Sequence, residues 1–200
     1  MLQSYDHLDE EQRRGLIEQI AENSDRLESL VENIIDLSRL KSMSMKLKME
    51  YTNLGDLVRD RVEFYRDLFL KNSEQEIVMN IEPDVIIKCD RHYIGHTIDN
   101  LLRNAVQYGE GKPVTIDVHK SDDDAVEFVI TDSGIGIPEE EVKEIFNAFT
   151  VSSKTKTLAG GRGVGLALCR AAVEAHGEAI SADSKGGKGA QFRFVLSGAK

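Results

Sequence analysis

The sequence is poor in cysteine, in long apolar runs and in basic residues. Cys89 and Cys169 are the only two cysteines in 200 residues, and their spacing matches neither a metal site nor a disulfide framework. We therefore expect two free thiols in a reducing compartment, the cytoplasm. No run approaches the roughly 20 apolar residues of a membrane-spanning helix, and the first residues lack the apolar core of a signal peptide. A membrane anchor elsewhere in a full-length protein is compatible with this expectation.

The charge balance argues against a nucleic-acid-binding protein. Lys and Arg number 25 against 35 Asp and Glu, which leaves a formal net charge of −10. Because nucleic-acid binding depends on clustered Lys and Arg, we expect no nucleic-acid partner. A chain of this length that is 40% hydrophobic and 30% charged is expected to fold as one compact domain with an appendage, and not to be disordered.

The appendage is a long amphipathic helix near the N-terminus. Asp9 is a suitable N-cap, and Gln12 follows three residues later as in a capping box. Apolar residues then recur at intervals of three and four, as in a coiled coil or bundle: Ile17, Ile20, Leu27, Leu30, Val31, Ile34, Leu37 and Leu40. Such a stripe needs a partner. A second copy in a homodimer is favoured over packing on the helix's own domain, because little apolar sequence nearby is available to cover it.

A mixed pattern of helices and strands follows residue 48. Amphipathic helices are predicted over 54–72 and 91–108, and strands over 76–82, 85–90, 114–120, 125–132, 179–184 and 190–196. The acidic stretch between the third and fourth strands predicts an antiparallel hairpin. A short helix is expected after Pro138 and a longer one after Gly163. Because strands come in hairpins and do not each alternate with a helix, the pattern favours an α+β fold, a two-layer α/β sandwich, over a doubly wound parallel sheet.

The stretch DSGIGIP, residues 132–138, places a carboxylate directly before two glycines. Asp132 ends an apolar strand, and Gly134 and Gly136 permit close approach of a flat ligand. A carboxylate at the floor of a pocket accepts hydrogen bonds from an amino group. Taken alone, the stretch fits equally well a turn in which the Asp side chain caps local backbone.

A pair of asparagines on the helix over 91–108 points to a metal and phosphates. Asn100 and Asn104 are four residues apart and project from one face, with Tyr108 one turn further along. Amide oxygens suit Mg²⁺, which commonly accompanies nucleotide phosphates. Without other motifs, two such asparagines are more often surface or cap residues.

A glycine-rich stretch over 158–168 adds an anion site. Its backbone N–H groups and the start of the following helix are suited to phosphate, and its glycines are Gly160, Gly161, Gly163 and Gly165. It is not a P-loop, because no Gly-Lys-Ser or Gly-Lys-Thr follows. A simple flexible loop is the alternative.

In this order and spacing the motifs resemble the catalytic domain of bacterial sensor histidine kinases, in the GHKL superfamily that shares the Bergerat ATP-binding fold. The resemblance covers nearly the whole chain. DNLLRNAVQY is similar to the N box, DSGIGIP to the first glycine box, IFNAF to the F box, GGRGVGLAL to the second glycine box and GGKGAQFRF to the closing glycine segment.

The resemblance implies a role for each matching residue. Asp132 would bind the adenine amino group of ATP, and Asn104 with Asn100 would hold Mg²⁺ and the phosphates. Tyr108 would pack at the base of the site. Glycines of the two glycine boxes would line it: Gly134, Gly136, Gly161, Gly163 and Gly165.

The segment 150–159 is similar to the mobile ATP lid of these kinases. From it, Lys154 or Lys156 is expected to reach the phosphates as a mobile point charge, with a solvated loop as the alternative. Phe146 and Phe149 are expected to pack at the root of the lid. Two residues depart from the family pattern: Gln107 stands where Lys is usual, and Arg162 replaces a small hydroxyl residue.

The resemblance also indicates the reaction. The acid that activates water in gyrase-type ATPases corresponds to Asn100, and an amide is no general base. The expected activity is therefore transfer of the γ-phosphoryl group of Mg-ATP to a histidine, for signalling to a response regulator.

None of the five histidines has the acceptor setting, in which an acidic residue follows the His and a Pro comes shortly after. We expect residues 1–48 to be the second helix of a dimerisation hairpin whose acceptor helix lies outside this chain, and 49–200 to be the ATP-binding domain. An excised fragment is favoured over a naturally shortened protein. Two other functions stay open: a non-catalytic nucleotide-binding or interaction module, and a chaperone-like or topoisomerase-like ATPase.

Overall fold

A computed structural model describes residues 9–42, 45–69, 75–121, 125–155, 163–184 and 188–198. Its helices are α1 (Glu10–Leu40), α2 (Leu54–Phe69), α3 (Arg91–Tyr108) and α4 (Gly165–Ala175), with a short 3-10 helix over Glu139–Glu141. Its strands are β1 (Met49–Asn53), β2 (Ile77–Ile81), β3 (Ile86–Asp90), β4 (Val114–Lys120), β5 (Ala125–Asp132), β6 (Ile180–Asp183) and β7 (Ala190–Ser197).

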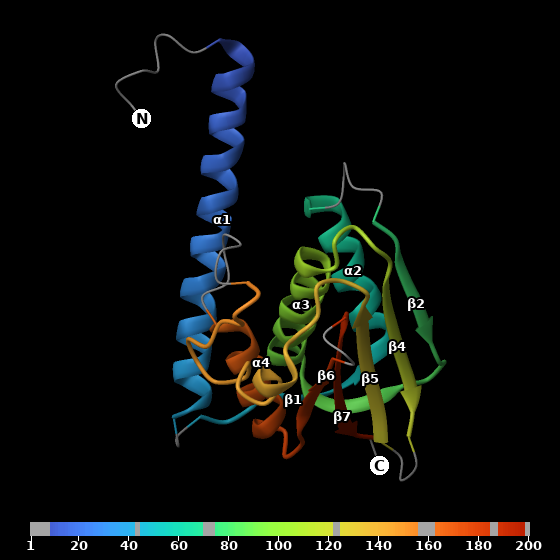
Figure 1. The fold of residues 1–200 in the computed structure, drawn as a ribbon. Helices are drawn as coiled ribbons and strands as arrows, with labels where there is room; N and C mark the ends of the chain where they lie inside the picture. The colour runs from blue at the N-terminus through green and yellow to red at the C-terminus, as the bar shows by residue number, and fades with distance from the viewer. Residues whose placement is uncertain are drawn as a thin grey trace.

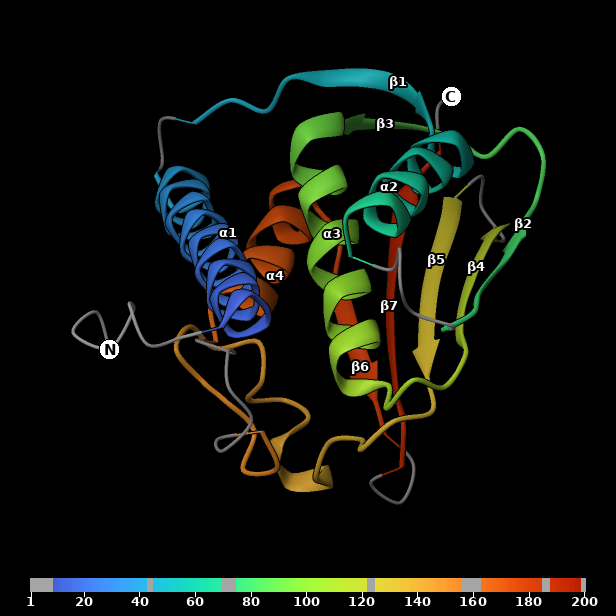
Figure 2. The same cartoon turned by 90° about the horizontal axis from the view of Figure 1, so that it is seen from above.

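The domain has two layers. Five strands form one sheet in the order β2-β4-β5-β7-β6, and α2, α3 and α4 cover one of its faces (Figures 1 and 2). β4 and β5 form the predicted antiparallel hairpin, with Thr115 opposite Thr131. β2 runs parallel to β4, and the remaining pairs are antiparallel. The predicted two-layer α/β sandwich is therefore confirmed.

The core lies between the sheet and the helices. Along β7, buried and exposed residues alternate because successive side chains point to opposite faces of the sheet. Phe128 of β5 and Phe194 of β7 stack in this core with ring centroids 4.8 Å apart. Cys89 and Cys169 are buried here as free thiols, as the sequence predicted.

One strand was missed by the sequence pattern. β1 lies in a stretch for which we predicted neither a helix nor a strand, and it pairs antiparallel with β3 in a separate two-stranded sheet. Only Thr52 of its five residues is buried. A strand with so little apolar alternation is recognisable only through its pairing partner.

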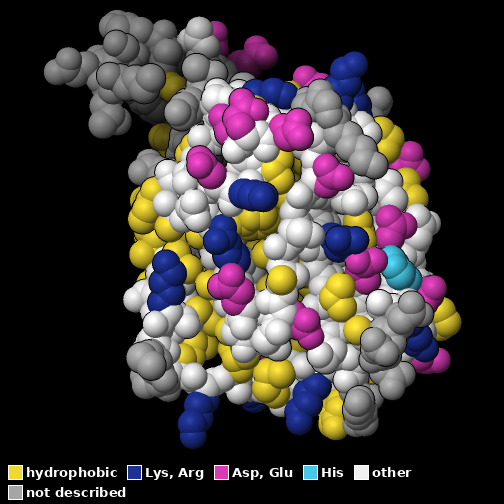
Figure 3. All heavy atoms as spheres, turned by 60° about the horizontal axis from the view of Figure 1, so that its bottom comes forward, with side chains coloured by type: hydrophobic (Ala, Val, Ile, Leu, Met, Phe, Trp, Pro, Cys, Tyr) yellow, Lys and Arg dark blue, Asp and Glu magenta, His cyan; other side chains and the backbone are white. Residues whose placement is uncertain are grey.

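α1 is a single helix that begins at the predicted capping box, in which Asp9 accepts from the Gln12 backbone N–H at 2.8 Å. Part of its apolar stripe packs on the chain's own domain, since Leu37 shares a buried cluster with Val164, Ala167 and Leu168, against which Leu30 and Leu40 also pack. The rest is exposed: Ile17, Ile20, Leu27, Val31 and Ile34. Figure 3 shows hydrophobic side chains at the surface on the side where Figure 1 places α1. Pairing with a second copy through this exposed part stays a prediction.

Within the described ranges, no helix combines the length and the apolar character that a bilayer crossing requires.

Candidate functional site

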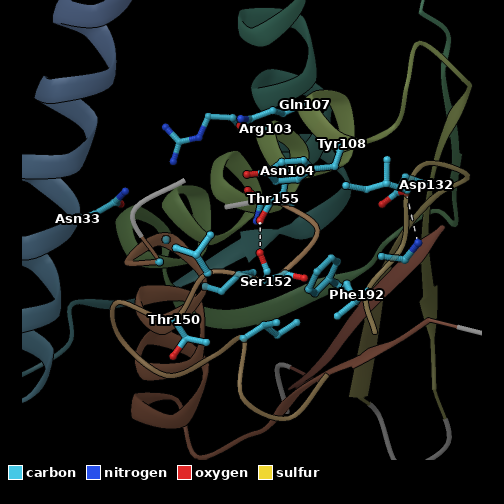
Figure 4. Close-up of a pocket in the computed structure, with 18 of the residues that line it drawn as sticks. Asn33, Arg103, Asn104, Gln107, Tyr108, Asp132, Thr150, Ser152, Thr155 and Phe192 are labelled. Carbon is cyan, nitrogen blue, oxygen red and sulfur yellow. Dashed lines mark hydrogen bonds between the residues drawn. The ribbon is translucent and has the colours of Figure 1, made fainter. Parts of the chain in front are cut away.

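A pocket of about 440 Å³ lies between α1, α3 and the segments that follow β5 (Figure 4). This volume is typical of a small-molecule site. Six parts of the chain contribute to its lining. They supply Asn23, Leu27, Ser29, Leu30 and Asn33 from α1; Arg103, Asn104, Gln107 and Tyr108 from α3; Asp132 with 135–137; Ile145, Thr150, Val151, Ser152 and Thr155 from the segment before α4; Gly163, Gly165 and Leu166 at the start of α4; and Ala190 and Phe192 from β7.

Asp132 stands at the buried end of β5. Its Oδ1 accepts hydrogen bonds from the backbone N–H groups of Gly134, at 2.9 Å, and Ala190, at 3.3 Å. Its Oδ2 makes no hydrogen bond to another described residue. Burial raises the pKa of this carboxyl above its ordinary value, and the two backbone N–H groups and Lys112 oppose that rise. One oxygen is thus fixed by backbone while the other is available to an amino group of a ligand.

The two glycines that follow Asp132 have different surroundings. Gly136 lines the pocket, with φ at +68°. Gly134 is not among the lining residues, and a Cβ there would meet the backbone oxygen of Tyr108 at 1.8 Å. That oxygen accepts from the N–H of Ile135 at 3.1 Å. Gly134 therefore permits the end of β5 to pack against the end of α3, which places Asp132 beside Tyr108.

α3 brings Asn104 and Tyr108 to the pocket together, as their spacing predicted. The side chain of Asn104 makes no hydrogen bond to another described residue, so its amide is available to a ligand. Burial raises the pKa of the Tyr108 phenol, while Arg103 and a hydrogen bond with Thr155 oppose the rise. Gln107 also lines the pocket.

Asn100 does not line the pocket with Asn104. It is buried against α1, and its Nδ2 donates to the His96 backbone oxygen at 2.9 Å and to Asn33 Oδ1 at 3.2 Å. Its Oδ1 accepts from Asn33 at 3.4 Å and from Arg103. A buried amide must satisfy its donors and acceptors, and here α1 provides the partner.

Arg103 is a site residue that the sequence reasoning missed. It is the only Lys or Arg among the described residues of the lining. Its guanidinium extends toward α1 (Figure 4) and donates to Ser29 Oγ and Asn100 Oδ1. Its position three residues after Asn100 on the same helix could have identified it, because residues three and four apart share a face.

The predicted lid is described only in part. Lys154 is exposed and donates from Nζ to the backbone oxygen of Ile135 at 2.7 Å, at the edge of the pocket. Before it, Ser152 Oγ and the Ser153 N–H donate to Glu141, which ties the segment to the 3-10 helix. The other predicted lid and glycine-box residues lie outside the described residues: Lys156, Gly160, Gly161 and Arg162.

At the start of α4, Gly163 and Gly165 line the pocket. Gly163 has φ at +67°, and a Cβ there would meet the Thr150 backbone oxygen at 2.3 Å. Of the two phenylalanines expected at the lid's root, Phe146 is buried and packs edge-on against Phe192. Phe149 is 72% exposed, so the expectation that it packs there is wrong. Its backbone has φ at +65°, and its N–H donates to the Gly163 backbone oxygen at 2.8 Å.

Residues 89–200, more than half of the chain, match the family model described as "Histidine kinase-, DNA gyrase B-, and HSP90-like ATPase". The chain belongs to this ATPase family. Within the family, the chain matches the ATP-binding domains of sensor histidine kinases in both sequence and fold, as the motif resemblance predicted.

Two curated relatives show what share of a whole sensor kinase corresponds to this chain. It is 34% identical to the sensor protein KdpD of Clostridium acetobutylicum over 98% of this chain and 22% of the relative. It is 31% identical to the sensor histidine kinase WalK of Bacillus subtilis over 86% of this chain and 29% of the relative. The chain thus spans about a quarter of the length of these kinases.

The structure is also similar to solved histidine kinases of the family. The crystal structure of full-length ShkA in complex with AMPPNP superposes with a TM-score of 0.76 at 26% identity, over 96% of this chain and 40% of ShkA. This likeness extends through α1, because so high a coverage leaves few residues unmatched.

Proposed function

We propose that this chain binds Mg-ATP in the pocket and is the catalytic part of a protein-histidine kinase, which transfers the γ-phosphoryl group to a histidine outside this chain. The observation that carries the proposal is Asp132, whose Oδ1 is held by two backbone N–H groups while its Oδ2 stays available. Membership of the ATPase family supports the choice of ligand.

The pocket residues fit a nucleotide by their chemistry. Asp132 would accept the adenine amino group, with Tyr108 and Gly136 beside the ring. Asn104, whose amide has no described partner, would hold Mg²⁺, a hard cation that prefers oxygen ligands. When bound, Mg²⁺ neutralises charge on the phosphates. Arg103 is placed to add positive charge at the same end of the pocket, where Lys154 and Lys156 are proposed to assist from the lid.

Asn100 would bind Mg²⁺ and the phosphates together with Asn104 only after its hydrogen bonds to Asn33 and Arg103 are broken. Asn33 belongs to α1, so α1 would have to move away. The Asn100 amide also bears on the reaction, since it offers no general base to activate water. The chain's residues therefore favour holding the phosphates for transfer to a side chain over hydrolysis, with catalysis by positioning and charge neutralisation.

The acceptor, the partners and the division of the chain belong to the same proposal. Residues 1–48 would be the second helix of a dimerisation hairpin and 49–200 the ATP-binding domain. The exposed apolar residues of α1, such as Ile17 and Ile20, are suited to a homodimer. The phosphorylated histidine would then pass the signal to a response regulator.

The test is calorimetric titration of Mg-ATP into the protein and its Asp132→Asn variant. Loss of a charged acceptor for the adenine amino group is expected to weaken binding roughly 10- to 100-fold, the equivalent of about 1.5–3 kcal/mol. Asp183→Asn, which changes an exposed carboxylate on β6, is the matched control and should bind as the parent does. Absence of binding by the folded parent would refute the proposal.

A second measurement separates the kinase from the two alternatives. The protein is incubated with γ-labelled ATP and a separately produced acceptor helix, and acid-labile phosphohistidine is measured. Labelling of the acceptor supports the kinase. Binding without labelling would identify a non-catalytic module, and rapid hydrolysis that Asn100→Ala abolishes would identify an ATPase.

A further inference from the structure

Two histidines and an aspartate meet at the contact between α1 and the start of α3. The pocket's Asp132 lies near the other end of α3, beside Tyr108. Asp36 lies on α1, and His92 and His96 lie four residues apart on α3, so that both rings project from the same face. The contacts run in opposite order along the two helices: Ser29 meets Arg103, Asn33 meets Asn100, and Asp36 meets the two histidines. Neither the motifs nor the proposed kinase reaction uses this cluster.

Its geometry is that of a metal-binding triad. Asp36 Oδ2 lies 3.2 Å from His92 Nε2 and 3.1 Å from His96 Nδ1, and the three atoms all lie within 4.8 Å of one another. In a tetrahedral zinc site with bonds of about 2.0–2.1 Å, neighbouring ligand atoms are about 3.3 Å apart. The two distances from Asp36 Oδ2 to the histidine nitrogens are therefore already close to those between neighbouring ligands in such a site.

We propose that Asp36, His92 and His96 bind a divalent transition-metal ion, best matched by Zn²⁺, which bridges α1 and α3. Two imidazole nitrogens and one carboxylate oxygen suit the borderline metals of the first transition row. They do not suit Mg²⁺, which prefers oxygen ligands. The site is thus distinct in chemistry from a magnesium site at the nucleotide.

The surroundings orient these side chains as ligands. The Asp36 side chain is only 5% exposed, and its other oxygen, Oδ1, lies 3.7 Å from Arg39 Nη1, which orients the carboxylate. The His96 side chain is only 22% exposed, and its Nδ1 faces the same Asp36 oxygen as the His92 ring does. His92 is half exposed, which leaves a path for the ion and a fourth position for water.

The alternative is that the two rings only donate hydrogen bonds to the same carboxylate oxygen. A metal would replace those protons and join the two helices through coordination bonds. Because Asn33 and Asn100 pair one helical turn away, the bound ion would also stabilise the contact that occupies Asn100. This consequence for the nucleotide rests on the proposed function, whereas the metal site does not.

The experiment is calorimetric titration of Zn²⁺ into the full chain without nucleotide, with Mg²⁺ as the comparison ion. Two variants test the ligands, His92→Gln and His96→Gln. The first substitution leaves the core intact, because the His92 side chain is half exposed. His119→Gln is the matched control, because His119 pairs with Glu127 on the sheet, away from α1. Hydrogen exchange with and without Zn²⁺ reports whether α1 and α3 are joined.

We expect one Zn²⁺ per chain, weakening of Zn²⁺ binding on the order of tenfold or more in each ligand variant, and no change in His119→Gln. Zn²⁺ should slow amide exchange around Asp36 and His92 in the parent but not in His92→Gln. The proposal fails if the folded parent takes up no Zn²⁺, or if both ligand variants bind it as the parent does. Since no nucleotide enters the assay, failure here is distinguishable from failure of ATP binding.

Discussion

Asn33 of α1 and Asn100 of α3 exchange two hydrogen bonds, at 3.2 and 3.4 Å. Beside this pair, Ser29 of α1 accepts from Arg103. α1 therefore occupies two polar groups of α3 that the phosphates and metal of a nucleotide would use. With the proposed function, contacts of this kind would couple the docking of α1 to nucleotide binding, and the coupling would act equally in both directions.

Asn33→Ala tests this coupling. The variant removes both hydrogen bonds to Asn100, so the free energy of unfolding is expected to fall by about 1–2 kcal/mol. Affinity for Mg-ATP is expected to rise roughly 2- to 10-fold, because Asn100 no longer has to be released. Urea unfolding and calorimetry measure the two effects. Ser38→Ala, an exposed change on the same helix, should leave the affinity unaltered and should not lower the stability. A loss of stability in Asn33→Ala without a gain in affinity would show that the pair is only structural.

The raised pKa of Asp132 predicts how ATP affinity depends on pH. Its carboxyl must be ionised for Oδ2 to accept from an amino group while Oδ1 accepts from the two backbone N–H groups, so affinity should fall as pH falls. The fall should begin above the range where an ordinary aspartate with a pKa of 3.8 titrates, because burial raises the pKa of this one. ATP titrates as well, so the measurement is the difference between the parent and Asp132→Asn. A difference that does not change from mildly alkaline to mildly acidic pH would contradict the prediction.

The same raised pKa bears on stability without ligand. A carboxyl whose pKa is higher in the folded than in the unfolded state contributes stability that is present at low pH and is lost as pH rises through the folded-state pKa. Asp132→Asn, which keeps an acceptor for the two backbone N–H groups, should therefore leave the ligand-free protein at least as stable as the parent at neutral pH. Thermal unfolding checks this outcome.

Two glycine-to-alanine substitutions test the packing of β5 on α3, one at the contact itself and one as a control on α1. Gly134→Ala would place a Cβ 1.8 Å from the Tyr108 backbone oxygen, and it is expected to cost about 1–3 kcal/mol of stability and to weaken ATP binding by displacing Asp132. Gly15→Ala on α1 meets nothing within 4 Å and should raise helix stability by about 0.5–1 kcal/mol. Circular dichroism during urea unfolding compares the two. Equal effects would show that the close contact with Tyr108 does not constrain the site.

Much of the fold could be predicted because its elements carry strong local signals. β7 alternates between buried residues and more exposed ones, and α1 starts at a capping box that uses only Asp9 and Gln12. β1 had no such signal, since its formation depends on pairing with β3, which is distant in sequence. Phe149 was misplaced for a related reason: its backbone has φ at +65° and bonds to Gly163, fourteen residues later, and no local pattern encodes that conformation.

By itself, the sequence determined the elements other than β1, the ATPase family and the positions of Asp132, Asn104 and Tyr108, because periodicity and motif spacing act over a few residues along one helix or strand. Only the tertiary structure decided what surrounds them. Asn100 and Asn104 look equivalent on one helix face, yet Asn100 is held by Asn33 while Asn104 faces the pocket. The same docking of α1 gathers Asp36 with His92 and His96. Contacts between residues more than fifty positions apart depend on how helices pack, and no short stretch of sequence contains that information.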